Sequence, residues 1–279
     1  MPAPLLVLGG IVSVQIGGAL AVRLIPTTGA LGAVSLRLGL GALILVAIVR
    51  PAIRRLHRAD LLAVGAFGLV LAVMNASFYA AIARLPLGVA VTVEFLGPLG
   101  LAAATSRRRR DLVGVALATA GVVLVNAHDF GHVATAGLLF ALLAGAMWAA
   151  YVLASAQVGR RLPRLDGLVG AMLVSAVLVV PAGVVHAGAV LIEPRVLLVG
   201  LGVAVLSSVL PYSLELLALR RISPAVFGVL MSLEPAVAAV AGLVMLGQHL
   251  AVVQVAGMLC VVGASVLVTR SRRSAPLDV

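Results

Sequence analysis

Four ionisable side chains, Arg37, Glu94, Glu215 and Glu234, lie within long apolar stretches of the sequence. The stretches are long enough to cross a bilayer, whose hydrocarbon core is about 30 Å thick. A charge at the centre of a membrane-spanning helix costs roughly 2.5 to 3.5 kcal/mol, and such residues usually line a cavity, pair with one another or carry protons. We therefore expect these residues to take part in binding a substrate or in moving protons.

Two of the carboxyl groups stand close to a proline: Pro98 follows Glu94 by one helical turn, and Pro235 follows Glu234 directly. Proline lacks the backbone N–H donor and leaves a carbonyl one turn earlier without its partner, so a helix kink is predicted at each proline. Keeping a carboxylate charged in an apolar setting is costly, and protonation removes that cost. We therefore expect Glu94 or Glu234 to be protonated reversibly during function.

Arg37, Glu94 and Asn75 are expected at a similar depth in the membrane. Arg37 and Glu94 each lie seven residues from the outer ends of their apolar segments, and Asn75 lies eight residues from its own. At about 1.5 Å per residue, all three lie roughly 10 to 12 Å deep. Two interpretations are open. Arg37 and Glu94 form a buried ion pair that only fixes helix packing, or they belong to a site that handles substrate or protons.

Glu215 lies about four residues from the cytoplasmic end of its segment. It either pairs with Arg220 or Arg221 at that end, by extending toward the interface, or it lines the site. Both interpretations are open from the sequence.

Several uncharged polar and aromatic residues complete the candidate site. Asn75, Tyr79 and Tyr212 offer hydrogen bonds to a small polar solute, although tyrosines near the ends of spans also form aromatic belts. Trp148, the single tryptophan, lies in the middle of its segment, which favours a cavity wall over an interfacial belt. We expect no cofactor and no metal, because the sequence has no phosphate-binding loop, no nucleophile elbow and no cluster of metal ligands.

The elements that position these residues are ten apolar segments, each predicted to be a membrane-spanning helix. The chain is 63% hydrophobic and 10% charged, with a mean hydropathy of +1.23, so its polar side chains are too few to cover a soluble globule. Residues 1–279 are predicted to form a single all-helical transmembrane domain. The segments are Pro4–Leu24, Ala30–Val49, Leu61–Ala83, Leu87–Thr105, Asp111–Val125, Gly137–Val158, Gly167–His186, Val196–Leu219, Ala225–Gly247 and Val252–Thr269.

Arginine placement predicts the orientation, because basic loops resist translocation and remain cytoplasmic. Three arginines follow odd-numbered segments, namely Arg23, Arg84 and Arg195, whereas sixteen follow even-numbered segments. The sixteen are Arg50, Arg54, Arg55, Arg58, Arg107 to Arg110, Arg160, Arg161, Arg164, Arg220, Arg221, Arg270, Arg272 and Arg273. Both termini are therefore predicted to be cytoplasmic. The net charge of +11 comes from these breaks between spans, so we expect contact with lipid and no nucleic-acid partner.

An internal repeat relates the two halves of the chain. A shift of 137 positions places Arg23 on Arg160, Pro26 on Pro163, Val89 on Val226, Leu96 on Leu233 and Pro98 on Pro235. Each half, residues 4–126 and 137–270, contains five predicted spans, and an odd number of spans inserts the second copy upside down. Inverted repeats are typical of secondary transporters, because two similar halves can open a central site to each side in turn.

Several motifs resemble one known family. The stretch from Leu206 to Glu215, LSSVLPYSLE, is followed by MSLEPA from Met231 to Ala236. PLGVAV from Pro86, EFLGPL from Glu94 and GAMWAAY from Gly145 resemble the matching motifs of the other spans. Over essentially the whole chain, the sequence is similar to the EamA family of the drug/metabolite transporter superfamily. The resemblance implies ten helices in two inverted five-helix repeats, a central cavity, and proton-coupled efflux of small amino acids or related metabolites.

From these arguments we expect a secondary transporter in the inner membrane of a bacterium. We predict that it exports small neutral amino acids, such as threonine or homoserine, by proton antiport, since no nucleotide-binding motif couples it to ATP. One alternative is an EamA-type permease for another metabolite or drug. Alternatives of another class are a membrane scaffold without transport activity and an intramembrane enzyme. An enzyme would need paired catalytic groups that the sequence does not show, and a scaffold would not need three buried glutamates.

Overall fold

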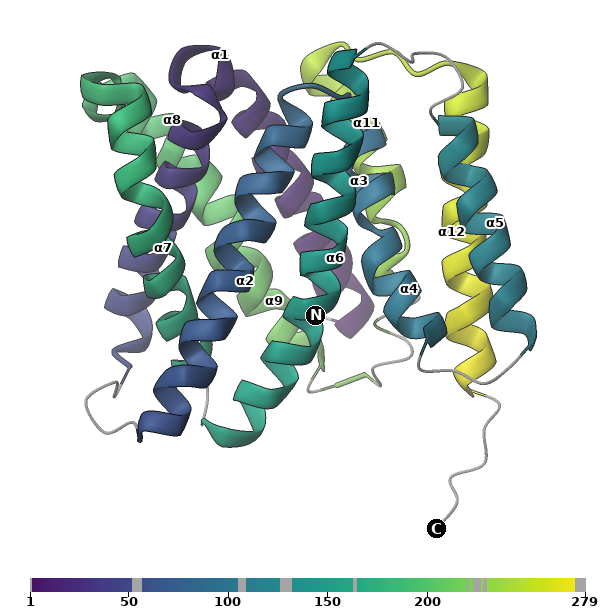
Figure 1. The fold of residues 1–279 in the computed structure, drawn as a ribbon, viewed down its shortest axis with the longest axis horizontal. Coiled ribbons are helices and arrows are strands. Elements are labelled where there is room, and N and C mark those ends of the chain that lie inside the picture. Colours follow the sequence, from purple (N-terminus) through teal and green to yellow (C-terminus); the bar gives the residue numbers. More distant parts are fainter. Residues whose placement is uncertain are drawn as a thin grey trace.

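In the computed structural model the described residues are 2–51, 57–104, 109–125, 132–162, 165–219, 221–222, 227 and 230–273. Every regular element within them is a helix, and the helices lie side by side in a bundle (Figure 1). They are α1 (Ala3–Val49), α2 (Arg58–Ile82), α3 (Leu87–Glu94), α4 (Leu96–Ala104), α5 (Arg109–Val125), α6 (His132–Arg161), α7 (Asp166–Ala187), η2 (Gly188–Ile192), α8 (Pro194–Ala204), η3 (Val205–Val209), α9 (Leu210–Leu219), α11 (Glu234–Leu246) and α12 (Val252–Arg273).

The helices have the length and composition of membrane spans. Five are long and apolar enough to cross a bilayer: Ala3–Val49, Arg58–Ile82, Thr135–Arg161, Asp166–Ile192 and Pro194–Glu215. Shorter apolar helices cover Leu87–Leu101, Glu234–Leu246 and Val252–Leu267. Many outward-facing side chains are large and apolar, including Val185 at 88% exposure and Leu198 at 70%. Such a surface suits contact with lipid, so the chain is an all-helical, multi-pass membrane protein.

The first two predicted spans form the single element α1. Its 47 residues would extend about 70 Å if straight, more than twice the thickness of hydrocarbon. Gly29 (φ 69°, ψ 168°) is the one non-helical residue within it, and the two halves run in opposite directions on either side (Figure 1). The predicted break at Ile25–Gly29 is thus narrower than expected. A side chain at Gly29 would suffer from the positive φ and would meet Nε2 of His186 at 2.5 Å.

Two predicted spans are interrupted beside their glutamates. The span predicted over Leu87–Thr105 is divided at Phe95, between α3 and α4. The span predicted over Ala225–Gly247 has a turn at Ser232–Leu233, and α11 begins at Glu234; residues 223–226 and 228–229 lie outside the described residues. Pro235 therefore starts a helix and does not kink one, as suits a residue without an N–H donor. The two interruptions occupy positions that the 137-residue shift superimposes.

The span predicted over Val196–Leu219 also differs from a plain α-helix. It contains α8, a π-helical turn over Val205–Val209 that is labelled η3, and α9. π-Turns widen the hydrogen-bonded ring by one residue and occur often at functional sites. The remaining predicted spans lie within the observed helices or differ from them by a few residues; Gly167–His186, for example, corresponds to α7 at Asp166–Ala187.

Candidate functional site

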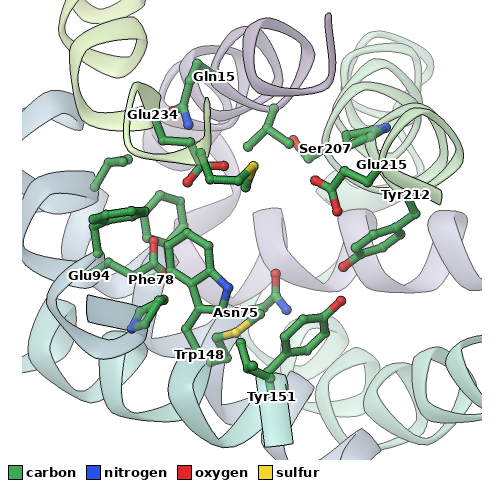
Figure 2. A pocket seen from close by; sticks show the side chains of 18 of the residues that line it. Gln15, Asn75, Phe78, Glu94, Trp148, Tyr151, Ser207, Tyr212, Glu215 and Glu234 are labelled. Atoms are coloured by element: carbon green, nitrogen blue, oxygen red, sulfur yellow. The ribbon is translucent and has the colours of Figure 1, made fainter. Parts of the chain in front are cut away.

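A cavity of about 380 Å³ lies inside the bundle, between the two halves of the chain (Figure 2). Its volume falls in the range of roughly 300 to 1,000 Å³ that is usual for small-molecule sites. The apolar part of its wall comes mainly from aromatic residues, methionines and prolines. The polar members of the wall are Gln15, Arg37, Asn75, Glu94, Tyr151, Ser207, Tyr212, Glu215, Glu234 and Ser265.

The three buried glutamates all face this cavity. Glu94 is the last residue of α3 and is 9% exposed, whereas Glu234 is the first residue of α11 and is 6% exposed. Glu215 on α9 lies across the cavity from Glu94, next to Tyr212 (Figure 2). None of the three carboxyl groups makes a hydrogen bond or an ion pair with another described residue. They are available to a solute or to protons.

Arg37 is the single basic residue among the residues that line the cavity, and it is anchored to the π-turn. Its Nη2 donates to the carbonyl oxygen of Ser207 at 3.0 Å, and its Nε donates to Oγ of Ser208 at 3.4 Å. Its guanidinium carbon lies 5.8 Å from the ring centroid of Tyr79. These two hydrogen bonds use two of the five N–H donors of the guanidinium.

The buried ion pair between Arg37 and Glu94, one of the two interpretations above, is absent from the structure. An ion pair within 4.0 Å is found in the described part of the chain between Arg161 and Asp60, at 3.8 Å. Arg37 and Glu94 are both described and form none. Both residues line the cavity, but the sequence gave no information on the direction of each side chain around its helix.

Most of the other candidates line the cavity. Nδ2 of Asn75 donates to the carbonyl of Leu71 at 2.8 Å, which leaves the amide oxygen for another donor. Trp148 stands in the wall and packs edge-on against Phe95, with ring centroids 5.7 Å apart. Tyr79 differs, because it is fully buried behind Arg37, is not part of the wall, and its hydroxyl has no hydrogen-bond partner among the described residues. It is better placed to support Arg37 than to contact a solute.

Glu215, for which pairing with Arg220 or Arg221 was the alternative, lines the cavity. Arg220 lies outside the described residues, and no ion pair within 4.0 Å joins Glu215 to Arg221. Its γ-carbon packs near Gly10 of α1 (a Cβ at Gly10 would lie 3.9 Å from it), well inside the bundle. The structure therefore favours the site-lining interpretation over the interfacial anchor.

Pro98 releases the carbonyl of Glu94 where α3 gives way to α4. In a continuous helix the N–H of residue 98 would bind that carbonyl, and proline has none. A Cβ atom at Gly145 of α6 would lie 2.5 Å from the same oxygen. Helix α6 thus passes directly over the break beside Glu94, and this close approach requires glycine at position 145.

Four polar lining residues were missed by the sequence analysis: Gln15, Tyr151, Ser207 and Ser265. Gln15 is 2% exposed and points into the cavity between Glu234 and Ser207 (Figure 2). A polar amide in the middle of an apolar segment was the available signal, the same signal that identified Asn75. For Ser207 the signal was weaker, because a serine can satisfy itself on its own helix.

The described residues contain no group of His, Cys, Asp or Glu side chains that could hold a metal ion. Beyond the cavity, the end of the bundle where α3 begins and α11 ends is closely packed. Oε1 of Gln248 accepts from the backbone N–H of Leu87 at 2.9 Å, and Arg23 donates to the carbonyl of Met245. A Cβ atom at Gly88 would lie 2.9 Å from the backbone of Ala239. We call these contacts the α3–α11 seal.

An apolar outer surface around a cavity lined by polar groups is typical of a multi-pass membrane transporter. Residues 135–270 match the model of the EamA-like transporter family, a range close to the predicted second repeat. The threonine/homoserine exporter RhtA of Salmonella typhimurium (strain LT2) is 42% identical over 266 residues, which are 95% of this chain and 90% of that protein. RhtA of Escherichia coli (strain K12) is 42% identical over 255 residues, 91% of this chain and 86% of that protein. The chain belongs to the EamA-like transporter family and is not an enzyme.

The fold is also found in a solved crystal structure. That structure aligns with 98% of this chain and 99% of its own with a TM-score of 0.65, at 18% sequence identity. At this identity the likeness concerns the fold alone.

Proposed function

We propose that this protein exports small neutral amino acids of the threonine and homoserine type from the cytoplasm of a bacterium, by proton antiport. The observation that carries the proposal is 42% identity, over 95% of the chain, to proteins named as threonine/homoserine exporters. Because the identity extends over nearly the whole chain, we expect the cavity of this protein to bind the same class of substrate as these relatives. An EamA-type permease for another metabolite or drug is the alternative within the family.

The cavity offers complementary groups for a hydroxylated amino acid. Its carboxylate would bind the free N–H donors of Arg37, and its ammonium group would bind one of the buried carboxylates. The side-chain hydroxyl group would bind Asn75 or Tyr212, both of which line the wall. Hydrogen-bonding groups of this kind discriminate well, because an analogue without the hydroxyl group leaves them unpaired.

Proton coupling is supported by an excess of acidic groups. Three carboxyl groups face a cavity that contains one guanidinium group. Glu234 lies within electrostatic range of both Glu215 and Glu94, whereas Glu94 lies within range of Arg37. An additional negative charge in a low-dielectric cavity is costly unless a proton or a cation neutralises it. We infer that Glu234 or Glu94 takes up a proton when the amino acid leaves.

Alternating access follows from the proposed architecture of ten helices in two inverted repeats, residues 4–126 and 137–270. In the proposed orientation the α3–α11 seal would lie on the outer side and would separate the cavity from the periplasm in this conformation. Exchange of roles between the repeats would open the seal and close the cytoplasmic side. The seal includes two hydrogen bonds between side chains and backbone, one to the N–H of Leu87 and one to the carbonyl of Met245. So few bonds suit a closure that must reopen.

Growth of a threonine-sensitive bacterium tests the function. Cells that overproduce the protein are expected to tolerate several-fold more threonine or homoserine than cells without it, because export lowers the cytoplasmic concentration. Amino acids are added one at a time, and retention of labelled threonine is measured in parallel.

Arg37→Ala is expected to remove the protection. Gly65→Ala serves as a control, since a Cβ atom there meets nothing within 4 Å. Equal sensitivity with the protein present in the membrane would contradict this function, and protection against a different solute would favour the alternative permease.

Cysteine labelling tests the orientation. In a Cys260→Ala background, Ala59→Cys at the start of α2 is expected to resist an impermeant thiol reagent added to intact cells, while Ala189→Cys in η2 should react. Both positions are exposed and lie at opposite ends of the bundle. The expectation rests on the arginine bias, which places both termini in the cytoplasm. Reaction of Ala59→Cys from outside, together with protection of Ala189→Cys, would reverse the topology.

A further inference from the structure

The π-turn η3 leaves one backbone carbonyl without a donor from its own helix. The N–H of Leu210 donates to the carbonyl of Val205, five residues earlier. The next bond of this pattern would run from residue 211 to Leu206, but residue 211 is proline and has no N–H. An unpaired carbonyl within a membrane protein is costly.

Ser13 of α1 supplies the missing donor. Its Oγ donates to the carbonyl of Leu206 at 2.7 Å, across a sequence separation of 193 residues. Arg37 has the same role at the neighbouring carbonyl. In a regular α-helix the N–H of residue 211 would bind the carbonyl oxygen of Ser207, which proline cannot do. Here Nη2 of Arg37 donates to that oxygen at 3.0 Å. Both carbonyls that Pro211 cannot serve are therefore served by side chains of α1.

One face of α1 is seated along the turn. One helical turn after Ser13, a Cβ atom at Gly17 would overlap Oγ of Ser207. One turn before it, a Cβ at Gly10 would lie 3.9 Å from the Cα of Pro211 and from Cγ of Glu215. Because there is no room to shift α1 toward η3, Ser13 is held at hydrogen-bond distance from Leu206.

The π-turn decides which side chains of α9 face the cavity. An α-helix turns by about 100° per residue, so the extra residue of a π-turn rotates everything after it by about that angle. Ser207 within the turn, and Pro211, Tyr212 and Glu215 after it, all line the cavity. In a plain α-helical turn, Leu210 would donate to Leu206 and satisfy the orphan carbonyl, but Tyr212 and Glu215 would turn away from their present positions.

We propose that Ser13 is a positioning residue of the cavity: the hydrogen bond that its hydroxyl donates to the carbonyl of Leu206 stabilises the π-turn, and the π-turn holds Tyr212 and Glu215 in the cavity wall. Ser13 itself need not touch the substrate, and it is not among the residues that line the cavity. The role of these wall residues in transport rests on the proposed function, whereas the geometry of the turn does not.

Labelling of a single cysteine measures this geometry without any substrate. In a Cys260→Ala, Tyr212→Cys background, a small hydrophilic thiol reagent is expected to modify position 212 from the cavity. Adding Ser13→Ala should slow the modification about two- to ten-fold, the range that corresponds to one hydrogen bond. Ser175→Ala is the matched control, because Ser175 is a buried serine whose Oγ bonds a carbonyl of its own helix at 2.8 Å, away from the cavity. Equal rates with Ser13 and with Ser13→Ala, or no labelling in either protein, would overturn the proposal.

A pair of isosteric substitutions separates the hydrogen bond from packing. Ser13→Thr keeps the hydroxyl group and Ser13→Val replaces it with a methyl group of similar size, so labelling should remain fast in the first and slow in the second. Equal labelling rates in Ser13→Thr and Ser13→Val would also overturn the proposal. This comparison can be made even if Ser13→Ala fails to fold. In proteoliposomes the apparent KM for threonine should rise in Ser13→Val with a smaller change in maximal rate. If the protein moves no threonine, the proposed function fails, yet the labelling result still decides the role of Ser13.

Discussion

Replacing Glu234 with glutamine is expected to abolish pH-driven efflux of the substrate while leaving the protein folded in the membrane. Glutamine keeps the volume of the side chain and an acceptor oxygen, but it cannot take up or release a proton. Glu234 faces the cavity, and its carboxyl group makes no hydrogen bond or ion pair with another described residue. It lies within electrostatic range of the carboxyl groups of Glu94 and Glu215. The same substitution at Glu94 tests the second candidate. The measurement is efflux of labelled threonine from proteoliposomes under an imposed pH gradient.

Exchange at equal pH distinguishes proton coupling from substrate binding. If Glu234 carries only the proton, Glu234→Gln should still exchange labelled for unlabelled threonine across the membrane, because exchange moves no net protons. If the carboxyl group instead binds the ammonium group, exchange should fail together with net efflux. Glu193→Gln is the control, since Glu193 is exposed and precedes α8 outside the cavity. Unchanged pH-driven efflux in both Glu94→Gln and Glu234→Gln would refute coupling through either glutamate.

A thermal melt of each variant tests the remaining structural interpretation of Glu94. If Glu94 were the ion-pair partner of Arg37, neutralising it would strand a buried charge and cost about 3 to 5 kcal/mol. In the structure Arg37 is held by Ser207 and Ser208 and forms no ion pair with Glu94. We therefore expect Glu94→Gln to melt close to the unsubstituted protein. A large drop in melting temperature without a transport defect in the surviving protein would restore the ion-pair interpretation.

Hydropathy and charge predicted the helical, membrane-spanning character of the chain because both depend on composition over many residues. Segment Gly167–His186 lies within α7, and the predicted break near Gly29 falls where α1 reverses. Burial of charge identified Arg37 and the three glutamates as inward-facing, since lipid excludes them at large cost. These predictions required no knowledge of which helices are neighbours.

The local distortions of the helices could not be predicted in the same way. At the π-turn over Val205–Val209, Ser13 and Arg37 bind backbone carbonyls from another helix, and the sequence around Pro211 does not reveal these contacts. The direction of Tyr79 likewise depends on Arg37 lying over its ring. Asn75, one helical turn away on α2, reaches the cavity, although the sequence made both residues candidates for the same site. Tertiary contacts decide such positions.

Replacing Gly97 with alanine is expected to destabilise the protein strongly. A Cβ atom at Gly97 would overlap the backbone carbonyl oxygen of Gly145, where α4 crosses α6. Backbone cannot move aside as a flexible side chain can, so α4 must shift as a whole, at a cost of about 1 to 3 kcal/mol or more. The shift would also displace the break at Phe95 and the neighbouring Glu94, so transport should fall with stability. The melting temperature in detergent and the yield of folded protein measure the effect.

Gly100→Ala is the matched control, because it lies one turn later on the same helix and a Cβ atom there meets nothing within 4 Å. Alanine is the better helix former, so this variant should be unchanged or more stable by up to about 1 kcal/mol. Gly145→Ala should resemble Gly97→Ala, since its Cβ atom would lie 2.5 Å from the carbonyl oxygen of Glu94. A single displacement of the α3–α4 junction from α6 relieves both overlaps, so the double variant should lose less stability than the two single variants together. Strict additivity, or equal melting of Gly97→Ala and Gly100→Ala, would show that the crossing of α4 and α6 is not as close as the structure places it.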